Sequence, residues 1–171
     1  MGGRITSERD FRVALIKASA VPIVTTMIGS AFALFPVIAS WPALPPLGLL
    51  MLLAWRLLRP EIWHAWIGLP LGLFDDLVSG QTIGTAIFLW TSILLILDFL
   101  DSQLLWRDYW VDWLIAAIAI VATISGGYWL SGLDGGHGTL MVALPQMLIS
   151  IACFPLTVRL CRLLDRWRLP S

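Results

Sequence analysis

Charged residues are missing from five long stretches of this chain, and those stretches are rich in aliphatic residues and tryptophan. They cover residues 18–55, 62–74, 77–97, 113–133 and 135–158. A helix that crosses the roughly 30 Å hydrocarbon core of a membrane needs about 20 mostly apolar residues. Each of the last three stretches therefore predicts one membrane-spanning helix.

The first stretch is too long for one helix, and three prolines lie between residues 42 and 46 in its middle. Proline lacks an amide donor and restricts the residue before it, so one helix ends there and another follows. The short stretch 62–74 becomes long enough if it continues through Asp75 and Asp76 to about residue 79. The pattern thus predicts six spans, over about 19–39, 46–58, 62–79, 82–100, 112–132 and 139–159.

The basic residues give an independent test of this topology, because Lys and Arg in short loops favour the cytoplasmic side of a membrane. With six spans, all 11 basic residues lie on one side. We therefore expect both chain ends in the cytoplasm. We expect 1–171 to be one integral membrane domain, with a cytoplasmic amphipathic segment over 1–18 and a cytoplasmic basic tail over 160–171.

Composition narrows the class of protein further. The chain is 58% hydrophobic and 13% charged, with a mean hydropathy of +0.85, whereas an ordinary soluble domain is about a quarter charged. Its net charge of zero argues against a general polyanion binder. Cys153 and Cys161 lie about 12 Å apart along one predicted helix and cannot form a disulfide with each other. We expect an all-α, polytopic membrane protein.

One strongly polar feature falls inside a predicted span. Residues 68–84 read Gly-Leu-Pro-Leu-Gly-Leu-Phe-Asp-Asp-Leu-Val-Ser-Gly-Gln-Thr-Ile-Gly. Carboxylates inside a membrane are costly and indicate a functional site. Adjacent helical residues point about 100° apart, so Asp75 and Asp76 face different surroundings. Three roles stay open for them: helix packing and capping, contact with a partner or ligand, and proton or metal chemistry.

Glycines spaced four apart flank the two aspartates. Gly68 with Gly72, and Gly80 with Gly84, form Gly-x-x-x-Gly patterns that permit close helix approach. Pro70 is expected to kink the helix. The candidate packing and partner-contact residues are therefore Gly68, Pro70, Gly72, Asp75, Asp76, Ser79, Gly80 and Gly84.

Groups suited to catalysis are few. Asp134 and His137 lie in one glycine-rich turn and supply two potential ligands, fewer than a catalytic zinc site needs, so a flexible turn is the favoured interpretation. The segment from Asp98 to Asp112 indicates either a docking surface or, preferably, a wetted loop anchored by aromatic residues. The sequence contains no phosphate-binding loop, zinc-protease motif or serine-hydrolase motif. We expect no enzymatic activity, no cofactor and no metal.

The core Asp76–Gly80, followed by Thr82-Ile83-Gly84, resembles the central signature of the bacterial rod shape-determining MreD family. The length, the six predicted spans and the near absence of extramembrane mass also resemble that family. Asp76 takes the family's acidic position, whereas Asp75 stands where an apolar residue is expected. Residues 81–83 replace a run of a small residue, proline and leucine.

The resemblance implies a non-catalytic scaffold of the cell-elongation machinery in the bacterial inner membrane. Such a protein maintains rod shape by organising peptidoglycan synthesis. The resemblance implies MreC and MreB as partners, with the RodA glycosyltransferase and its penicillin-binding transpeptidase, and it implies no nucleic acid. It also implies a fold like the substrate-binding subunits of energy-coupling-factor vitamin transporters.

That likeness supplies the alternative function, a substrate-binding membrane subunit for uptake of a small, vitamin-type molecule. Such a subunit needs a polar pocket that opens to the outside. The residues expected to line it are Asp75, Asp76, Gln81, Asp134 and His137.

Overall fold

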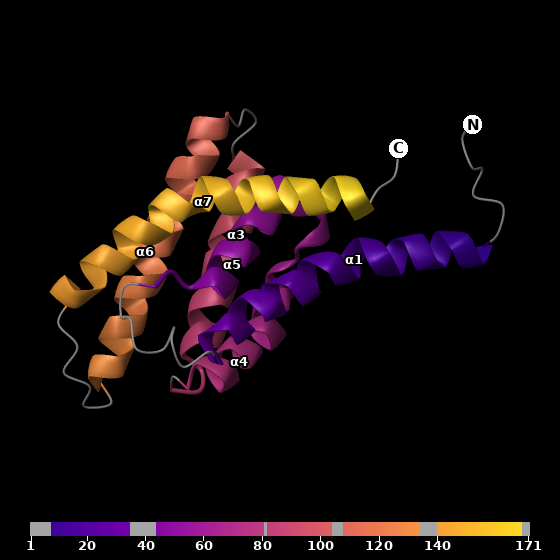
Figure 1. Ribbon diagram of the computed structural model, residues 1–171. Helices are drawn as coiled ribbons and strands as arrows, with labels where there is room; N and C mark the ends of the chain where they lie inside the picture. The colour runs from indigo at the N-terminus through magenta and orange to yellow at the C-terminus, as the bar shows by residue number, and fades with distance from the viewer. Residues whose placement is uncertain (1–7, 35–43, 81, 104–107, 134–139, 169–171) are drawn as a thin grey trace.

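The computed structural model describes residues 8–34, 44–80, 82–103, 108–133 and 140–168, and all regular structure within these ranges is helical (Figure 1). The α-helices are α1 (Glu8–Ala31), α3 (Leu47–Leu58), α4 (Gly68–Ser79), α5 (Thr85–Gln103), α6 (Tyr109–Leu133) and α7 (Leu140–Arg168). Short 3-10 helices cover Phe32–Leu34, Pro60–Ile62 and Ala65–Ile67. The all-α prediction is confirmed for the part of the chain that is described.

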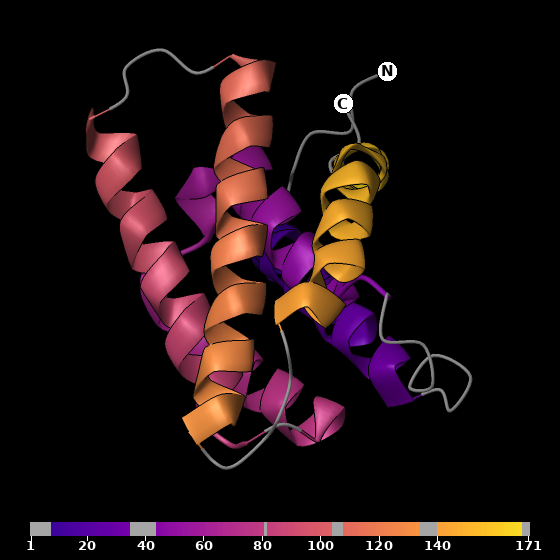
Figure 2. The same cartoon turned by 90° about the vertical axis from the view of Figure 1, so that its left-hand side faces the viewer.

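Among the described residues, three helical segments are long and apolar enough to cross a membrane: Thr85–Gln103, Tyr109–Gly132 and Ala143–Trp167. They correspond to the last three predicted spans. In Figure 2, α5 and α6 stand upright and side by side. α7 continues to Arg168, well past the predicted end near residue 159.

The short helix α3 is the centre of the molecule. Its 12 residues extend about 18 Å at 1.5 Å per residue. Apart from Met51, its side chains from Leu49 to Trp55 are at most 1% exposed, and α1, α6 and α7 all pack against it. A helix that is apolar on every side is stable when other helices surround it. Protein contacts therefore explain a hydrophobic segment too short to cross a bilayer alone.

The third predicted span, 62–79, is helical in part only. Trp63 and His64 are extended, with φ/ψ of −103°/103° and −88°/148°, and α4 begins at Gly68. Pro70 consequently lies in the first turn of α4, where a missing N–H leaves few intrahelical bonds unmade. The structure thus places Pro70 near a helix start and not at a kink within a longer helix.

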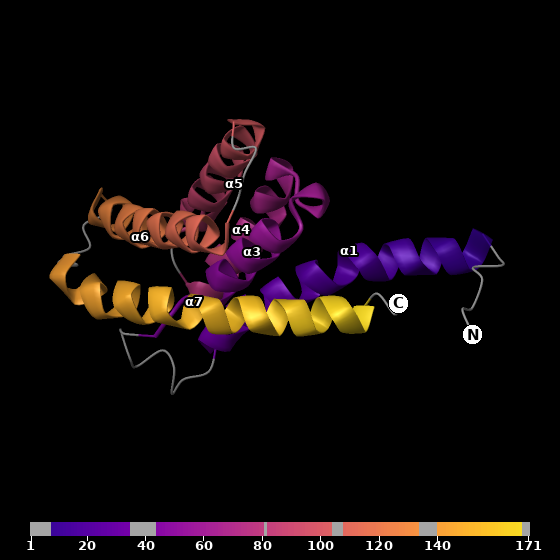
Figure 3. The same ribbon diagram turned by 90° about the horizontal axis from the view of Figure 1, so that it is seen from above.

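Helices α1 and α7 extend beyond the other helices on the same side of the molecule (Figures 1 and 3). Both contain internal prolines, Pro22 in α1 and Pro145 and Pro155 in α7. The first part of α7 rises beside α6, and its second part, yellow in Figure 1, runs across the bundle near the end where α5 finishes and α6 starts. Proline is a common cause of such a change of direction in a helix.

Candidate functional site in the α4–α5 hairpin

The Asp76 side chain, near the end of α4, caps the beginning of α5. Its carboxylate accepts hydrogen bonds from the backbone N–H groups of Gly84 and Ala86, each at 2.8 Å, and of Ile87 at 3.4 Å. The first N–H groups of a helix have no intrahelical acceptor, and the helix dipole favours negative charge beside them. With Asp76 only 1% exposed, the cap satisfies amides that would be costly to leave unpaired away from water.

Two glycines with positive φ shape the turn that this cap closes. Gly80, directly after α4, has φ of +68°, and Gly84, directly before α5, has φ of +108°. Side-chain-bearing residues rarely adopt these conformations. A Cβ atom at either position would meet no atom within 4 Å. The idea that the Gly80/Gly84 spacing brings two helices together is therefore wrong, because these glycines set the path of the backbone.

The other glycine pair brings the α4 and α5 backbones into contact. A Cβ atom on Gly72 would lie 2.7 Å from Ile87 Cα, and one on Gly68 would lie 2.9 Å from Thr91 Cα. Both distances are too short for any real side chain. This close approach holds the beginning of α5 within reach of the Asp76 carboxylate.

Asp75 faces a different environment from Asp76. It is half-buried, the Ser30 hydroxyl lies beside its carboxyl group, and the Ser79 hydroxyl donates to its backbone carbonyl at 2.7 Å. Asp75 also lines a cavity of about 620 Å³ at the end of the molecule that holds the α4–α5 turn. We call this the Asp75 cavity. Its described polar lining residues are Asp75, Ser79, Thr85, Thr123, Tyr128, Ser131 and Gln146.

A second cavity, of about 520 Å³, is an apolar groove between α1 and α4. We call it the α1–α4 groove. Its walls come from Pro22, Ile23, Met27, Trp63, His64, Trp66, Ile67, Pro70, Leu71, Leu73, Phe74 and Leu77. Leu73 and Leu77 are 41% and 63% exposed. The groove therefore presents an apolar surface to the surroundings of α4.

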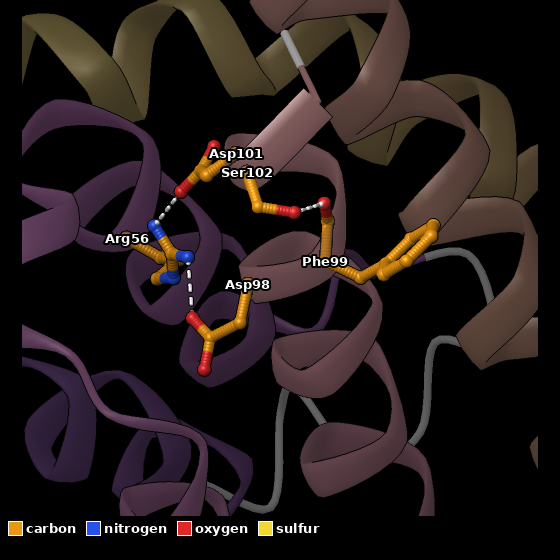
Figure 4. A network of polar contacts seen from close by, with 5 residues as sticks. All are labelled: Arg56, Asp98, Phe99, Asp101 and Ser102. Atoms are coloured by element: carbon orange, nitrogen blue, oxygen red, sulfur yellow. Dashed lines mark hydrogen bonds and ion pairs between the residues drawn. The ribbon is translucent and has the colours of Figure 1, made fainter.

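A buried arginine joins α3 to the far end of α5 (Figure 4). Arg56, 2% exposed, places Nη2 2.6 Å from Asp98 Oδ1 and Nη1 2.7 Å from Asp101 Oδ2. The two aspartates are three residues apart and share one face of α5. The sequence predicts that a span ends near residue 100 and that Asp98–Asp112 is a docking surface or a wetted loop, whereas α5 continues to Gln103 and carries both aspartates. The three-residue spacing of the two aspartates, on the side of the membrane that the sequence predicts for the basic residues, is the sequence signal for this cluster.

A second ion pair connects the end of α3 to α7. The Arg59 guanidinium donates to Asp165 Oδ2 from Nη2 at 2.9 Å and from Nε at 3.2 Å. This hydrogen bond and the negative charge of Asp165 raise the pKa of Arg59 above its ordinary value. Together, Arg56 and Arg59 connect three helices at the end of the molecule opposite the Asp75 cavity.

The remaining predicted pocket residues, Gln81, Asp134 and His137, lie outside the described residues. Within the described ranges, no group of three or more His, Cys, Asp or Glu side chains is placed to hold a metal ion. Of the three roles considered for the aspartates, the geometry gives Asp76 that of a helix cap and leaves Asp75 to face a cavity.

Comparison with known proteins gives one result. A family model described as rod shape-determining protein MreD matches residues 13–164 of the chain. No curated protein and no solved structure matches it.

Proposed function

The chain belongs to the MreD family of rod shape-determining proteins, and from this premise we propose that it acts as a non-catalytic scaffold of the cell-elongation machinery. Family membership gives the role in rod-shape determination, and three apolar helices indicate a membrane protein. We further propose that the protein crosses the bacterial inner membrane several times, with both termini in the cytoplasm. MreC, MreB, RodA and its penicillin-binding transpeptidase are the proposed partners in organising peptidoglycan synthesis.

The α1–α4 groove is the observation that supports a scaffold role. Its apolar walls, with Leu73 and Leu77 open to the surroundings, suit the side chains of another membrane helix. The buried polar groups, by contrast, serve the protein's own architecture. Asp76 binds the amides of α5, and Arg56 binds two aspartates of the same helix. We propose that MreC contacts the protein at this groove through an apolar segment.

Affinity capture from membranes with a C-terminal tag tests the scaffold. We expect MreC to co-purify with the chain, and deletion of the gene to turn rods into spheres. Leu73→Trp should fill the groove and reduce MreC capture, while Leu95→Trp, at an exposed position on α5 away from the groove, should not. Normal rod shape in a clean deletion would refute the functional proposal, and equal capture by both variants would refute the groove as the docking surface.

The Asp75 cavity supports a second candidate, the substrate-binding subunit of a small-molecule uptake transporter. Its wall combines one carboxylate with several hydroxyl groups and the Gln146 amide, which suits a polar ligand that carries an amine. Under this alternative, the tagged chain co-purifies with an ATPase module in place of MreC. A small amine would then raise the unfolding temperature of the purified chain, and Asp75→Asn would abolish that increase.

A further inference from the structure

The second part of α7, from residue 156 onward, does not run in the direction expected of a membrane-spanning helix. The helix has 29 residues and is about 43 Å long, well beyond the roughly 30 Å hydrocarbon core. α5 and α6 stand upright, whereas the second part of α7 runs crosswise to their direction near one end of the bundle and extends beyond it (Figures 1 and 3). If α5 and α6 follow the membrane normal, this part of α7 lies close to the plane of the membrane surface.

The Arg59–Asp165 pair places this segment at the end of the bundle. Arg59 directly follows α3, and its guanidinium lies 2.9 Å from Asp165. The Arg56 cluster, at the end of α5, is close to the same end. Residues around Asp165 are therefore at the depth where α3 and α5 finish, which is the level of the lipid headgroups if α5 crosses the membrane.

The surface of α7 from residue 156 onward divides into three strips. Val158, Cys161 and the half-buried Asp165 face the protein. Exposed apolar side chains form a second strip about 60° wide at 100° per residue: Leu156, Leu160, Leu163 and Trp167 are 68%, 47%, 68% and 81% exposed. A third strip, between these two, carries Arg159, Arg162 and Arg166, all exposed.

The three arginines of this strip, the α7 arginine row, form no ion pair with an acidic side chain in the described part of the chain. They follow one another at spacings of three and four residues, so the row extends about 10 Å along the helix. An exposed apolar strip beside a row of cations is the pattern of a helix that lies in a membrane interface.

We propose that the second part of α7 is an interfacial helix that binds anionic phospholipid headgroups through Arg159, Arg162 and Arg166. The apolar strip enters the boundary between headgroups and acyl chains, and each guanidinium donates to lipid phosphate oxygens. Negatively charged lipids are preferred over zwitterionic ones because only they leave net negative charge beside the row. The protein thereby collects a particular class of lipid at one side of its bundle.

Native mass spectrometry of the full chain extracted from phosphatidylcholine vesicles that also contain phosphatidylglycerol tests the proposal. We expect the wild type to retain phosphatidylglycerol over phosphatidylcholine, less so at high salt. Neutralising the row in R159Q/R162Q/R166Q should weaken that retention by about fivefold for each arginine. The charge-preserving R159K/R162K/R166K variant is the matched control and should keep most of it.

Three results would overturn the proposal. One is equal retention of phosphatidylglycerol by the glutamine variant, and another is loss of retention in the lysine variant. The third is that inorganic phosphate binds the delipidated chain as tightly as phosphatidylglycerol, which would indicate a site for a free anion.

If the glutamine variant fails to fold, the depth of Trp167 in the bilayer can be measured on the wild-type chain and tests the proposal independently. Trp167 fluorescence, isolated as the difference between the wild type and W167F, should be quenched more by lipids brominated close to the headgroup than by lipids brominated at the chain end. Stronger quenching by chain-end bromine would show a spanning segment, and absence of quenching by either lipid would show a segment in water. Both results would refute an interfacial helix.

Discussion

The Asp76 carboxylate accepts a hydrogen bond from the backbone N–H of Ala86 at 2.8 Å, so a side chain on one helix caps the next helix along the chain. A cap residue ordinarily directly precedes the helix that it caps. Here the two residues are ten positions apart in the sequence, and the interaction closes the complete α4–α5 turn. The same carboxylate binds the Gly84 amide, so turn geometry and helix start depend on one side chain.

Replacing Asp76 should destabilise the protein more than replacing its neighbour. Asp76→Ala removes the acceptor of two short hydrogen bonds from the backbone N–H groups of Gly84 and Ala86. Each buried donor left without a partner costs about 1–3 kcal/mol. Asp76→Asn keeps one carbonyl acceptor and should lose less. Unfolding of the detergent-solubilised protein, followed by circular dichroism, measures the order of the variants.

Asp75→Asn is the matched control for the Asp76 variants, because Asp75 is half-buried beside a cavity and its carboxylate caps no helix. We expect the unfolding temperature to fall in the order wild type, D75N, D76N, D76A. An Asp75→Asn loss as large as that of Asp76→Ala would contradict the capping role.

Adding one methyl group at Gly72 should separate two helices. The new Cβ atom would lie 2.7 Å from Ile87 Cα, and backbone atoms cannot move aside as a flexible side chain can. Overpacking of this kind costs about 1–3 kcal/mol. Gly132→Ala in α6 meets no atom within 4 Å and should be neutral or stabilising, since alanine is the better helix former. Equal thermal stability of the two variants would show that α4 and α5 are not in close contact.

The charge-free stretches were sufficient to locate α5, α6 and α7, because twenty apolar residues between polar segments leave few other structures possible in a membrane. Together with the prolines between residues 42 and 46, they also located α3, which is predicted over 46–58 and observed at Leu47–Leu58. They were insufficient for α4, which starts only at Gly68 because Trp63 and His64 are extended. No local pattern in the sequence marks that extended segment.

The candidate site, like the fold, was predictable from the sequence only in part. The Gly68/Gly72 spacing drew attention to glycines whose backbones do lie against α5. The same spacing misled at Gly80 and Gly84, where the pattern coincides with a turn. The Asp76 cap depends on how tightly the turn closes, which only three-dimensional geometry reveals. A single sequence also does not indicate which arginine pairs with which aspartate, so the ion pairs of Arg56 with Asp98 and Asp101 were not predicted.

Removing Arg56 should be among the most damaging single changes at the opposite end of the molecule. Arg56 is 2% exposed, and without it two aspartates on one face of α5 repel each other. Breaking a buried ion pair costs about 3–5 kcal/mol, so Arg56→Leu should unfold at a clearly lower temperature. Asp98, at 42% exposed, contributes through a partly solvated pair, and Asp98→Asn should cost less than about 1 kcal/mol.

The variant R56L/D98N/D101N separates loss of packing from loss of charge balance. It removes the repulsion that R56L creates, so we expect it to recover part of the lost unfolding temperature. If the triple variant is no more stable than R56L, electrostatic balance does not explain the arginine.

The Arg59–Asp165 pair should respond to salt and not to ordinary changes of pH. Because the pKa of Arg59 is raised in the folded protein, the stabilisation from this group is complete below the pKa of the unfolded chain and is lost only at pH values above the folded pKa. Between neutral and mildly alkaline pH, the difference in unfolding temperature between wild type and Arg59→Gln should therefore stay constant. Because Arg59 is 37% exposed, that difference should correspond to less than about 1 kcal/mol and shrink as salt is added.

Glu61→Gln, which removes only the 3.6 Å contact to an exposed carboxylate, is the control and should change stability less than Asp165→Asn. A difference that grows with salt, or an equal effect of the two acidic substitutions, would rule out this pair as the connection between α3 and α7.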